Sequence, residues 1–563
     1  MKKMSLKGKI ILSVISGIIF SFCFFYLAIP AINPADPSFW SSLTVVFLSF
    51  AYPFLFKSSD SESGKGKGKG KKKGKNPAFQ FNFNTNGKKF NKITLLVVLA
   101  PLTIMIIGSI ISSTLFNAKA YAGVITVTEA DFATDMKESG EVTNIALMDG
   151  ESARYLGNKT LGKVSHMVSQ YVVSDNYTQI NYKYTPKKVA NLEHADFFKW
   201  FANMEKGVPG YVMVDPVNNS AEYMELKKPL KYVSSAYFGD DLMRKLRFDY
   251  PTKIFDDFIS FEVDDEGNPY YIITCLQPRI FPFGAMDVSE AVVFDPCTGE
   301  STLYAVDEVP AWVDAVYSGD LAEEKYNWYG TLSGGFFNSI IGNKDCKQTT
   351  DDYGYIVIGD DVWYFTGVTS VTSDESNIGF IISNARTGEY KYYPVVGAEE
   401  YGAMNAAEGE VQEKGYTASF PSLINVSGQA TYIMVLKDAS GFVKLYALVN
   451  VEQPSVVATA PNQAEAMKAY KELLVENDII SGSTAPEATA KTAEITVTDV
   501  KTYTVDGNTV FYFLGNDNIF YKGILKDNED LIFITVGASL SIKYTDSDNA
   551  AIKNITSVEI VAK

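Results

Sequence analysis

Five clusters of acidic residues are the side chains in this sequence best suited to chemistry. Two carboxylates held close together can catalyse glycoside hydrolysis, and several together can bind Ca²⁺. The clusters are Asp240-Asp241, Asp256-Asp257, Asp264-Asp265-Glu266, Asp351-Asp352 and Asp360-Asp361. Adjacent residues on a strand point to opposite faces, and most of these clusters fall in predicted turns. We therefore predict solvated turn carboxylates, with a hydrolase that uses paired carboxylates as the alternative.

No other motif predicts a catalytic or metal site. The two histidines, His166 and His194, have no partners at HExxH or CxxC spacing, so each is expected at the surface or capping a helix. No GxSxG elbow, Walker loop, GxGxxG loop or DxDxDG calcium loop occurs, although the members of a Ser/His/Asp triad can lie far apart in sequence. The sequence therefore predicts no catalytic, cofactor-binding or metal-binding residue and no cofactor.

The charge of the chain is divided between two oppositely charged regions. The 563 residues carry a net charge of −16, from 50 basic and 66 acidic side chains. Residues 1–120 hold 16 lysines and three acidic residues, a balance of +13, so the remaining residues carry −29. An acidic bulk disfavours nucleic acid as a partner, because the phosphate backbone is negative.

Three apolar runs in residues 1–120 predict three transmembrane helices. They cover residues 10–32, 40–56 and 93–115. About 20 apolar residues are needed to cross the hydrocarbon core, so the 17 residues of the second run are at the short limit. A re-entrant or interfacial segment is the alternative for that run.

The lysines predict the orientation of these helices. Positive charge stays in the cytoplasm, so the N-terminus and the loop 57–92 are expected inside the cell, and residues 121–563 outside it. The low-complexity part of this loop contains seven lysines that are candidate contacts for anionic lipids. They are Lys65, Lys67, Lys69, Lys71, Lys72, Lys73 and Lys75. The alternative is that they serve only to set the topology. An Ala-x-Ala triplet ending at Ala120 leaves cleavage there open, although the preceding apolar core is longer than that of a signal peptide.

Three cysteines fall in the region predicted to be extracellular. A disulfide persists outside the cell, and we predict one between Cys275 and Cys297, which are close in sequence. Cys346 then remains free, and Cys23 lies within the first apolar run.

Residues 121–480 are predicted to form an extracellular α+β domain built from repeats. Each repeat is a strand, a turn rich in Asp, Asn and Gly, a second strand and an amphipathic helix. The hairpins cover residues 211–226, 291–306, 378–396 and 432–451, followed by helices at 234–246, 310–329, 398–415 and 462–477. Gly or Asn supplies the positive φ of each turn, and Asp or Asn caps it.

The end of the chain is predicted to be a separate small domain. Residues 481–494 (SGSTAPEATAKTAE) read as a linker. Residues 495–563 contain about five short alternating strands, which favour an OB-like β-barrel. Its aromatic residues are expected to fill the core, so this barrel is not predicted to bind nucleic acid.

The hairpin turns also carry a family resemblance. The pattern V-x-x-D-x-x-T-G-E-x-x-x-Y in residues 291–306, and more loosely in 378–396, resembles the PepSY module of bacterial envelope proteins. The whole chain resembles uncharacterised membrane-anchored proteins of Gram-positive bacteria. The likeness implies protease inhibition or ligand binding in the envelope, but it assigns no functional residue, and the first and fourth hairpins lack the TGE turn.

Together these features predict a multi-pass cell-membrane protein without enzymatic activity. Its expected role is to bind, scaffold or regulate an unidentified envelope protein or cell-wall partner, with membrane lipids as its other contact. The alternatives are a membrane-tethered cell-wall hydrolase and a regulator of a membrane protease or transporter.

The orientation predicts a protease result. Protease added to intact cells should digest the chain after Ala118 and leave the lysine loop 65–75 intact, because only the former lies outside the membrane. Immunoblotting with antibodies against the two regions measures this. Digestion of the loop with protection of the C-terminal region would contradict the orientation.

Overall fold

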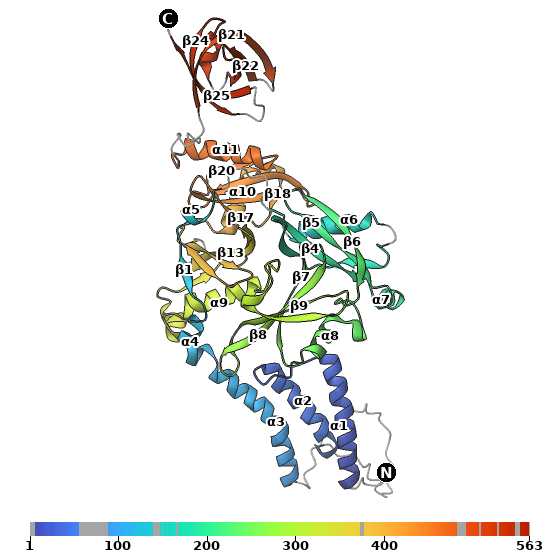
Figure 1. Ribbon diagram of the computed structural model, residues 1–563. Coiled ribbons are helices and arrows are strands. Elements are labelled where there is room, and N and C mark those ends of the chain that lie inside the picture. Colours follow the sequence, from blue (N-terminus) through green and yellow to red (C-terminus); the bar gives the residue numbers. More distant parts are fainter. Residues whose placement is uncertain are drawn as a thin grey trace, which may run out of the picture. The chain divides into compact units, whose positions relative to one another are not determined.

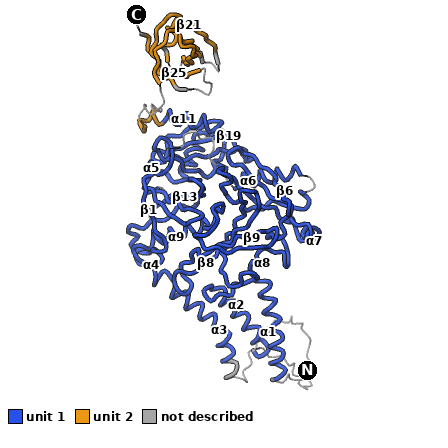
Figure 2. The backbone as a smooth tube through the Cα atoms, viewed as in Figure 1, with its two compact units in different colours: residues 1–473 blue, residues 474–563 orange. Residues whose placement is uncertain are grey.

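The computed structural model describes residues 6–55, 88–138, 147–148, 150–164, 167–371, 377–480, 491–505, 508–525, 528–546 and 552–561. The chain divides into two compact units, residues 1–473 and 474–563 (Figures 1 and 2). The lysines at 65–75 and His166 lie outside the described residues, as does residue range 481–490 of the predicted linker.

Unit 1 begins with three helices, of which two are long and apolar enough to cross a membrane. The helices are α1 (Leu6–Ala28), α2 (Pro37–Leu55) and α3 (Lys88–Ile111), and the candidate spans are Lys7–Ala28 and Lys92–Ile111. Two of the three predicted spans are therefore found within the described residues, and the second run forms the helix α2, which is not among the candidates. Its helix, α2, contains four serines, a threonine and two prolines, which dilute its apolar content. It packs against α1, where Gly17 leaves room for the ring of Phe50.

Both candidate spans end against the folded domain that follows them. The guanidinium of Arg244 donates to the carbonyl of Tyr26 (3.1 Å), and that of Arg247 donates to the carbonyl of Ile29 (3.0 Å), at the C-terminal end of α1. Cations are favoured there because the last carbonyls of a helix are unpaired and carry its negative dipole end. Both arginines belong to α8 (Leu242–Asp249), so α8 holds the end of α1.

Two antiparallel sheets in the first half of the domain share one core. The first has order β2-β4-β5-β6 with β3 paired to β4, and the second has order β10-β9-β8-β7. Their bounds are β2 Tyr171–Val173, β3 Thr178–Tyr182, β4 Thr185–His194, β5 Val208–Asp215, β6 Ser220–Leu230, β7 Ile254–Val263, β8 Pro269–Ile280, β9 Gly284–Phe294 and β10 Ser301–Ala305. Buried apolar residues of both sheets form this core, which α6 (Gly150–Gly162) and α7 (Phe197–Asn203) also contact.

Two further sheets form the second half around α10 (Glu400–Glu410). One has order β1-β15-β14-β13-β11 with β12 paired to β13, and the other has order β16-β18-β19-β20 with β17 paired to β18. Their bounds are β1 Val127–Glu129, β11 Lys347–Thr349, β12 Gly354–Ile358, β13 Asp361–Ser370, β14 Gly379–Asn384, β15 Tyr390–Tyr393, β16 Thr417–Ala418, β17 Ser422–Val426, β18 Gln429–Lys437, β19 Val443–Asn450 and β20 Val457–Ala460. The remaining helices here are α4 (Thr114–Ala122), α5 (Phe132–Asp135), α9 (Gly319–Leu332) and α11 (Gln463–Glu476).

The four predicted hairpins form with the turn chemistry expected of them. They are β5–β6, β9–β10, β14–β15 and β18–β19, each antiparallel. In each turn an Asp or Asn side chain accepts hydrogen bonds from backbone amides of the turn. The accepting residues are Asp215, Asp295, Asn384 and Asp438. The positive φ falls on Asn219 in the first turn and on glycine in the other three. Local side-chain hydrogen bonds therefore set these four turns.

The helix predicted at 310–329 begins nine residues late. Residues 310–318 precede α9 as an irregular segment, because tertiary partners take their backbone groups. The amides of Val316 and Tyr317 donate to the carbonyl of Ala385 (2.9 and 2.8 Å). Ser318 then caps α9 by accepting from the amide of Leu321 (3.2 Å).

The predicted disulfide is not formed, and Cys275 and Cys297 are both free. In the β8–β9 register Cys275 pairs with Glu290, whereas Cys297 follows Phe294, which pairs with Tyr271. Four residues of strand separate these levels, about 13 Å at the usual rise, and a disulfide needs Cα atoms within about 7 Å. Closeness in sequence did not bring the two thiols together.

Unit 2 is a five-stranded barrel that closes in the order β21-β22-β23-β25-β24. Its strands are β21 Lys491–Val505, β22 Asn508–Gly515, β23 Phe520–Ile524, β24 Ser539–Asp546 and β25 Ile552–Val561. The strand β21 takes in the last four residues of the predicted linker, because Lys491 to Glu494 pair with β24. Phe511, Phe513 and Tyr521 are buried in the barrel core, as predicted. The prediction was wrong for Tyr503, which is exposed and stacks on the half-buried Tyr512.

The junction of α1 and α8 predicts a loss of stability in Arg247→Met. Arg247 is buried and donates to the carbonyls of Ile29, Tyr250 and Lys253, so methionine leaves three acceptors without this donor. The expected cost is about 2–4 kcal/mol of unfolding free energy. Thermal unfolding of the purified full chain in detergent measures it, with Arg154→Met as control, since Arg154 makes one exposed ion pair. Equal midpoints for the two variants would contradict a role for Arg247 in this junction.

Candidate functional site

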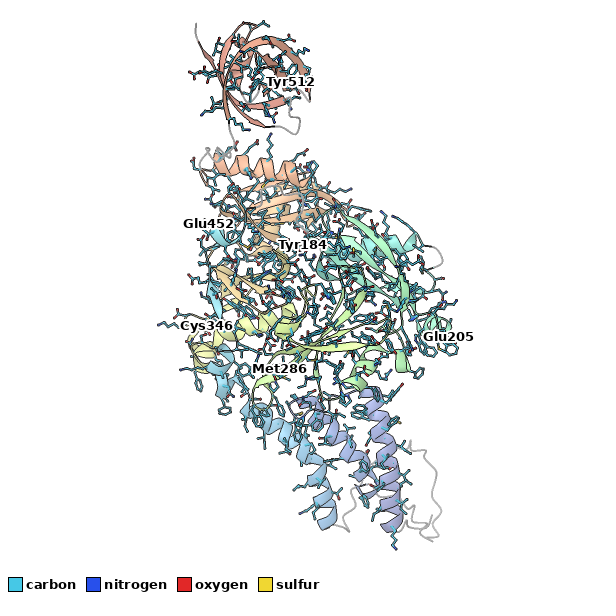
Figure 3. The ribbon with its side chains drawn as sticks, viewed as in Figure 1. Tyr184, Glu205, Met286, Cys346, Glu452 and Tyr512 are labelled. Carbon is cyan, nitrogen blue, oxygen red and sulfur yellow. The ribbon has the colours of Figure 1, made fainter. Side chains whose placement is uncertain are left out.

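An acidic cleft lies between β7 and the start of α9 in unit 1. Its volume is about 830 Å³, and Met286, labelled in Figure 3, lies in its wall. Five carboxylates line it, from Asp175, Asp256, Asp257, Asp320 and Glu324. The described lining residues include no lysine, arginine or histidine. The name acidic cleft is used below for this cavity and these five residues.

A bulge in β7 places two of these carboxylates in the same cleft. The register of β7 with β8 shifts between Phe255 and Ile259, so Asp256 and Asp257 fall outside the regular pairing. A bulge re-aims side chains that would alternate on a regular strand. Both residues line the cleft as a result, although adjacent residues of a regular strand point to opposite faces.

The opposite wall comes from the first turns of α9. The hydroxyl of Ser318 caps the helix and also donates to the Oδ2 of Asp256 (3.2 Å), which joins α9 to the β7 bulge. Asp320 and Glu324 lie four residues apart and therefore share one face of the helix. Asp320 lies in the first turn of α9, where the positive end of the helix dipole favours a negatively charged side chain.

Burial and neighbouring like charges raise the pKa of two carboxyls in the cleft. Burial, together with the neighbouring Asp257, raises the pKa of Asp256 above its usual range. Burial and the charge of Asp256 raise the pKa of Glu324 in the same way. A bound cation would offset this repulsion, so cation binding and proton release are linked at this cleft.

The other acidic clusters make local contacts outside the cleft. Asp241 caps α8 through the amide of Arg244 (2.8 Å), and Asp264 accepts from Glu266 and Asn268 in the β7–β8 turn. Asp361 pairs with Arg386 (2.5 Å). Asp241 and Asp264 therefore make the contacts of a helix cap and a turn, whereas Asp361 lies on β13 and pairs with an arginine 25 residues away.

Two buried carboxylates outside the cleft are structural. Glu262 accepts from the amides of Asp314 (2.7 Å) and Ala315 (3.0 Å) and from the hydroxyl of Ser260 (2.8 Å). Glu400 accepts from the amide of Gly367 (2.6 Å) and the hydroxyl of Thr350 (3.0 Å). Both side chains have no exposed surface, so neither can reach a ligand.

The remaining candidate residues do not assemble into a site. His194 ends β4 and is buried against Tyr171, so its predicted place at the surface or on a helix cap was wrong; burial lowers its pKa to about 4. Across the described residues, no group of three His, Cys, Asp or Glu side chains is arranged to hold a metal ion. A second, smaller hollow of about 300 Å³ lies where β12 and β17 meet the β3–β4 turn, with Tyr184 (Figure 3) on its wall.

Three residues of the acidic cleft were not predicted from the sequence. Asp175 and Asp320 are single acidic residues and Glu324 follows Glu323, and nothing in their spacing relates them to Asp256-Asp257. One available signal was the position of Asp256-Asp257 between apolar residues 254–255 and 258–259, which is unusual for a turn and typical of a bulged strand.

Comparison with known protein families and with curated proteins gives no match for this chain.

The buried carboxyls predict how stability depends on pH. Burial raises the pKa of Glu400 from 4.5 to about 7, with a similar rise for Glu323. Between these values the folded state holds a proton that the unfolded state has lost, so stability falls as the pH rises from about 4.5 to about 7 and then levels. Glu400→Gln removes one such group. The thermal unfolding midpoint should therefore decrease less between about pH 5 and about pH 7.5 in this variant than in the parent chain.

Glu410→Gln on the same helix is the control for this measurement, because Glu410 is exposed. Its pH dependence should match that of the parent chain. An unchanged slope in Glu400→Gln would show that Glu400 does not titrate in this range.

Proposed function

We propose that this protein is a membrane-anchored, non-enzymatic protein of the bacterial envelope that binds a polycationic ligand in the acidic cleft. The single observation that carries the proposal is the convergence of five carboxylates, from β7, α9 and the segment before β3, on one cavity of about 830 Å³. A partner segment rich in lysine or arginine fits this charge, because several ammonium groups can each approach a different carboxylate.

The anchoring part of the proposal rests on the first 120 residues. The two candidate spans begin close to lysines and end against the folded domain. Positive charge at their starting ends supports a cytoplasmic N-terminus and a domain outside the membrane. Because both spans then run outward, the proposal also has α2, which lies between them, return the chain across the membrane. The proposed location is therefore a multi-pass cell-membrane protein with its acidic cleft exposed outside the cell.

The architecture supports a regulatory or scaffolding role for the domain outside the membrane. Four hairpins, each followed along the chain by a helix, support the proposed resemblance to PepSY modules. That resemblance implies binding within the envelope. The strand order of unit 2, in which β23 and β25 are parallel and the rest antiparallel, supports an OB-like barrel. The partner is proposed to be an envelope protein or a cell-wall component, with membrane lipids as the other contact and no nucleic acid.

A cell-wall hydrolase is the second candidate function, and one observation favours it. Asp256 and Glu324 line the same cleft, and the pKa of each is raised. A carboxyl with a raised pKa close to a second carboxyl is the kind of pair that paired-carboxylate glycosidases use. Release of reducing sugar from cell-wall glycan by the full chain, abolished in Asp256→Asn, would favour this candidate over simple binding.

The binding proposal predicts weaker capture of a cationic probe by Asp320→Asn/Glu324→Gln. Both residues are exposed and lie on the wall of the cleft, so their replacement removes two charges with little effect on packing. Affinity for a tetralysine peptide at low salt should fall by roughly 5- to 20-fold, and added salt should reduce the difference. Isothermal titration calorimetry of the full chain in nanodiscs measures it.

The matched control is Glu205→Gln/Glu452→Gln, which removes two charges at exposed positions away from the cleft (Figure 3). Its affinity for tetralysine should stay within about twofold of the parent chain, because distant surface charges are screened. Equal losses in both double variants would mean that tetralysine responds to net charge alone, and the cleft proposal would be wrong.

A further inference from the structure

The tip of the β8–β9 hairpin packs against the outer end of α3. A Cβ on Gly108 of α3 would lie 2.4 Å from the ring of Phe283 and 2.9 Å from Pro282, so only glycine lets the hairpin come this close. A Cβ on Gly284 would in turn lie 2.6 Å from the carbonyl of Ser112. The hairpin and α3 therefore share a tight contact made possible by a glycine on each side.

This contact brings the hairpin tip down to the level of the apolar span. Gly108 lies three residues before Ile111, where α3 and the candidate span both end. At 1.5 Å per residue, Gly108 is about 4.5 Å inside the end of the span. Phe281, at the hairpin tip, is 87% exposed. An exposed phenylalanine next to this level of α3 faces the region that lipid occupies around the helix.

Other exposed apolar side chains surround the same outer ends. Phe116 lies on α4, which follows α3 directly, and Phe337, Ile340 and Ile341 follow α9. The ring of Phe336 packs in the cluster formed by α4, the β8–β9 hairpin and α9, which places that segment beside α4. We call the six residues Phe116, Phe248, Phe281, Phe337, Ile340 and Ile341 the apolar collar.

The collar also reaches the end of α1. Phe248 of α8 is half exposed and packs edge-on against Phe25 (5.6 Å between ring centroids) and against Tyr26 (6.2 Å). Exposed lysines, Lys119 and Lys344, accompany the collar in sequence. Aromatic rings with lysines beside them are typical of the boundary between hydrocarbon and head groups, because each residue then meets its preferred solvent.

We propose that the apolar collar inserts into the outer face of the bilayer that α1 and α3 cross, with Phe281 as its deepest residue. This inference rests on the membrane anchoring proposed above. Its occupant is lipid, since the collar is continuous with the ends of the apolar helices and Phe283 already contacts α3 within its span. The domain outside the membrane is then held against the surface at several points, and the acidic cleft keeps a set distance from the lipid.

Photocrosslinking tests this contact in the full chain. The photoreactive residue p-benzoylphenylalanine replaces Phe281 in protein reconstituted in nanodiscs of phosphatidylglycerol and phosphatidylethanolamine, and adducts are identified by mass spectrometry. The substitution keeps an aromatic ring at an exposed site, so folding is preserved. Ile18, exposed in the middle of α1, is the positive control. Tyr184, 83% exposed and distant from α1 and α3, is the matched negative control (Figure 3).

We expect at least about fivefold more lipid adduct at position 281 than at position 184, and a yield at 281 close to that at position 18. Lipid adducts at 18 but not at 281 would overturn the collar while leaving the anchoring intact. Adducts of position 281 with a second copy of the chain would overturn it in favour of self-association. The absence of lipid adducts at position 18 would overturn the anchoring, and the collar with it.

Discussion

Glu262 lies inside unit 1 with no exposed surface, and its carboxylate accepts hydrogen bonds from the amides of Asp314 and Ala315. A buried carboxylate is costly unless it is hydrogen-bonded, so this position holds the segment before α9 firmly against β7. Because those amides are taken, the segment cannot continue as helix, and α9 begins only after Ser318. The hydroxyl of Ser318 then reaches Asp256. The geometry of the acidic cleft therefore depends on this one buried acceptor.

Burial also keeps Glu262 partly protonated, because desolvation raises its pKa. Burial and the charge of Glu262 likewise raise the pKa of the nearby Asp314. Two such groups cannot both ionise cheaply in a dry interior. The structure thus contains two kinds of acidic group. Those in the interior organise backbone amides, whereas those of the acidic cleft line an open cavity, where Asp320 and Glu324 are exposed and Asp175 pairs with Arg154.

The turns and the last helix of the domain were predictable from sequence, whereas the candidate site was not. In the turn that contains Asp295 and Gly299, the hydrogen bonds join residues two to four positions apart, so the turn can be predicted from the local sequence. The start of α9, the missing Cys275–Cys297 disulfide and the burial of His194 depend on partners far along the chain. The same is true of the cleft, where Asp256 meets Ser318 across 62 residues.

By itself, the sequence determined the division of charge, two apolar helices with lysines at their starting ends, four hairpin turns and a small C-terminal barrel of alternating strands. These follow from composition and from short-range hydrogen bonding, which need no knowledge of distant partners. Only the tertiary structure decided which carboxylates meet, because a strand bulge and a capped helix bring them together from opposite sides of one cavity. It also decided that the β8–β9 hairpin lies against α3, since Gly108 of α3 leaves room for the ring of Phe283 and Gly284 of the hairpin leaves room for the carbonyl of Ser112.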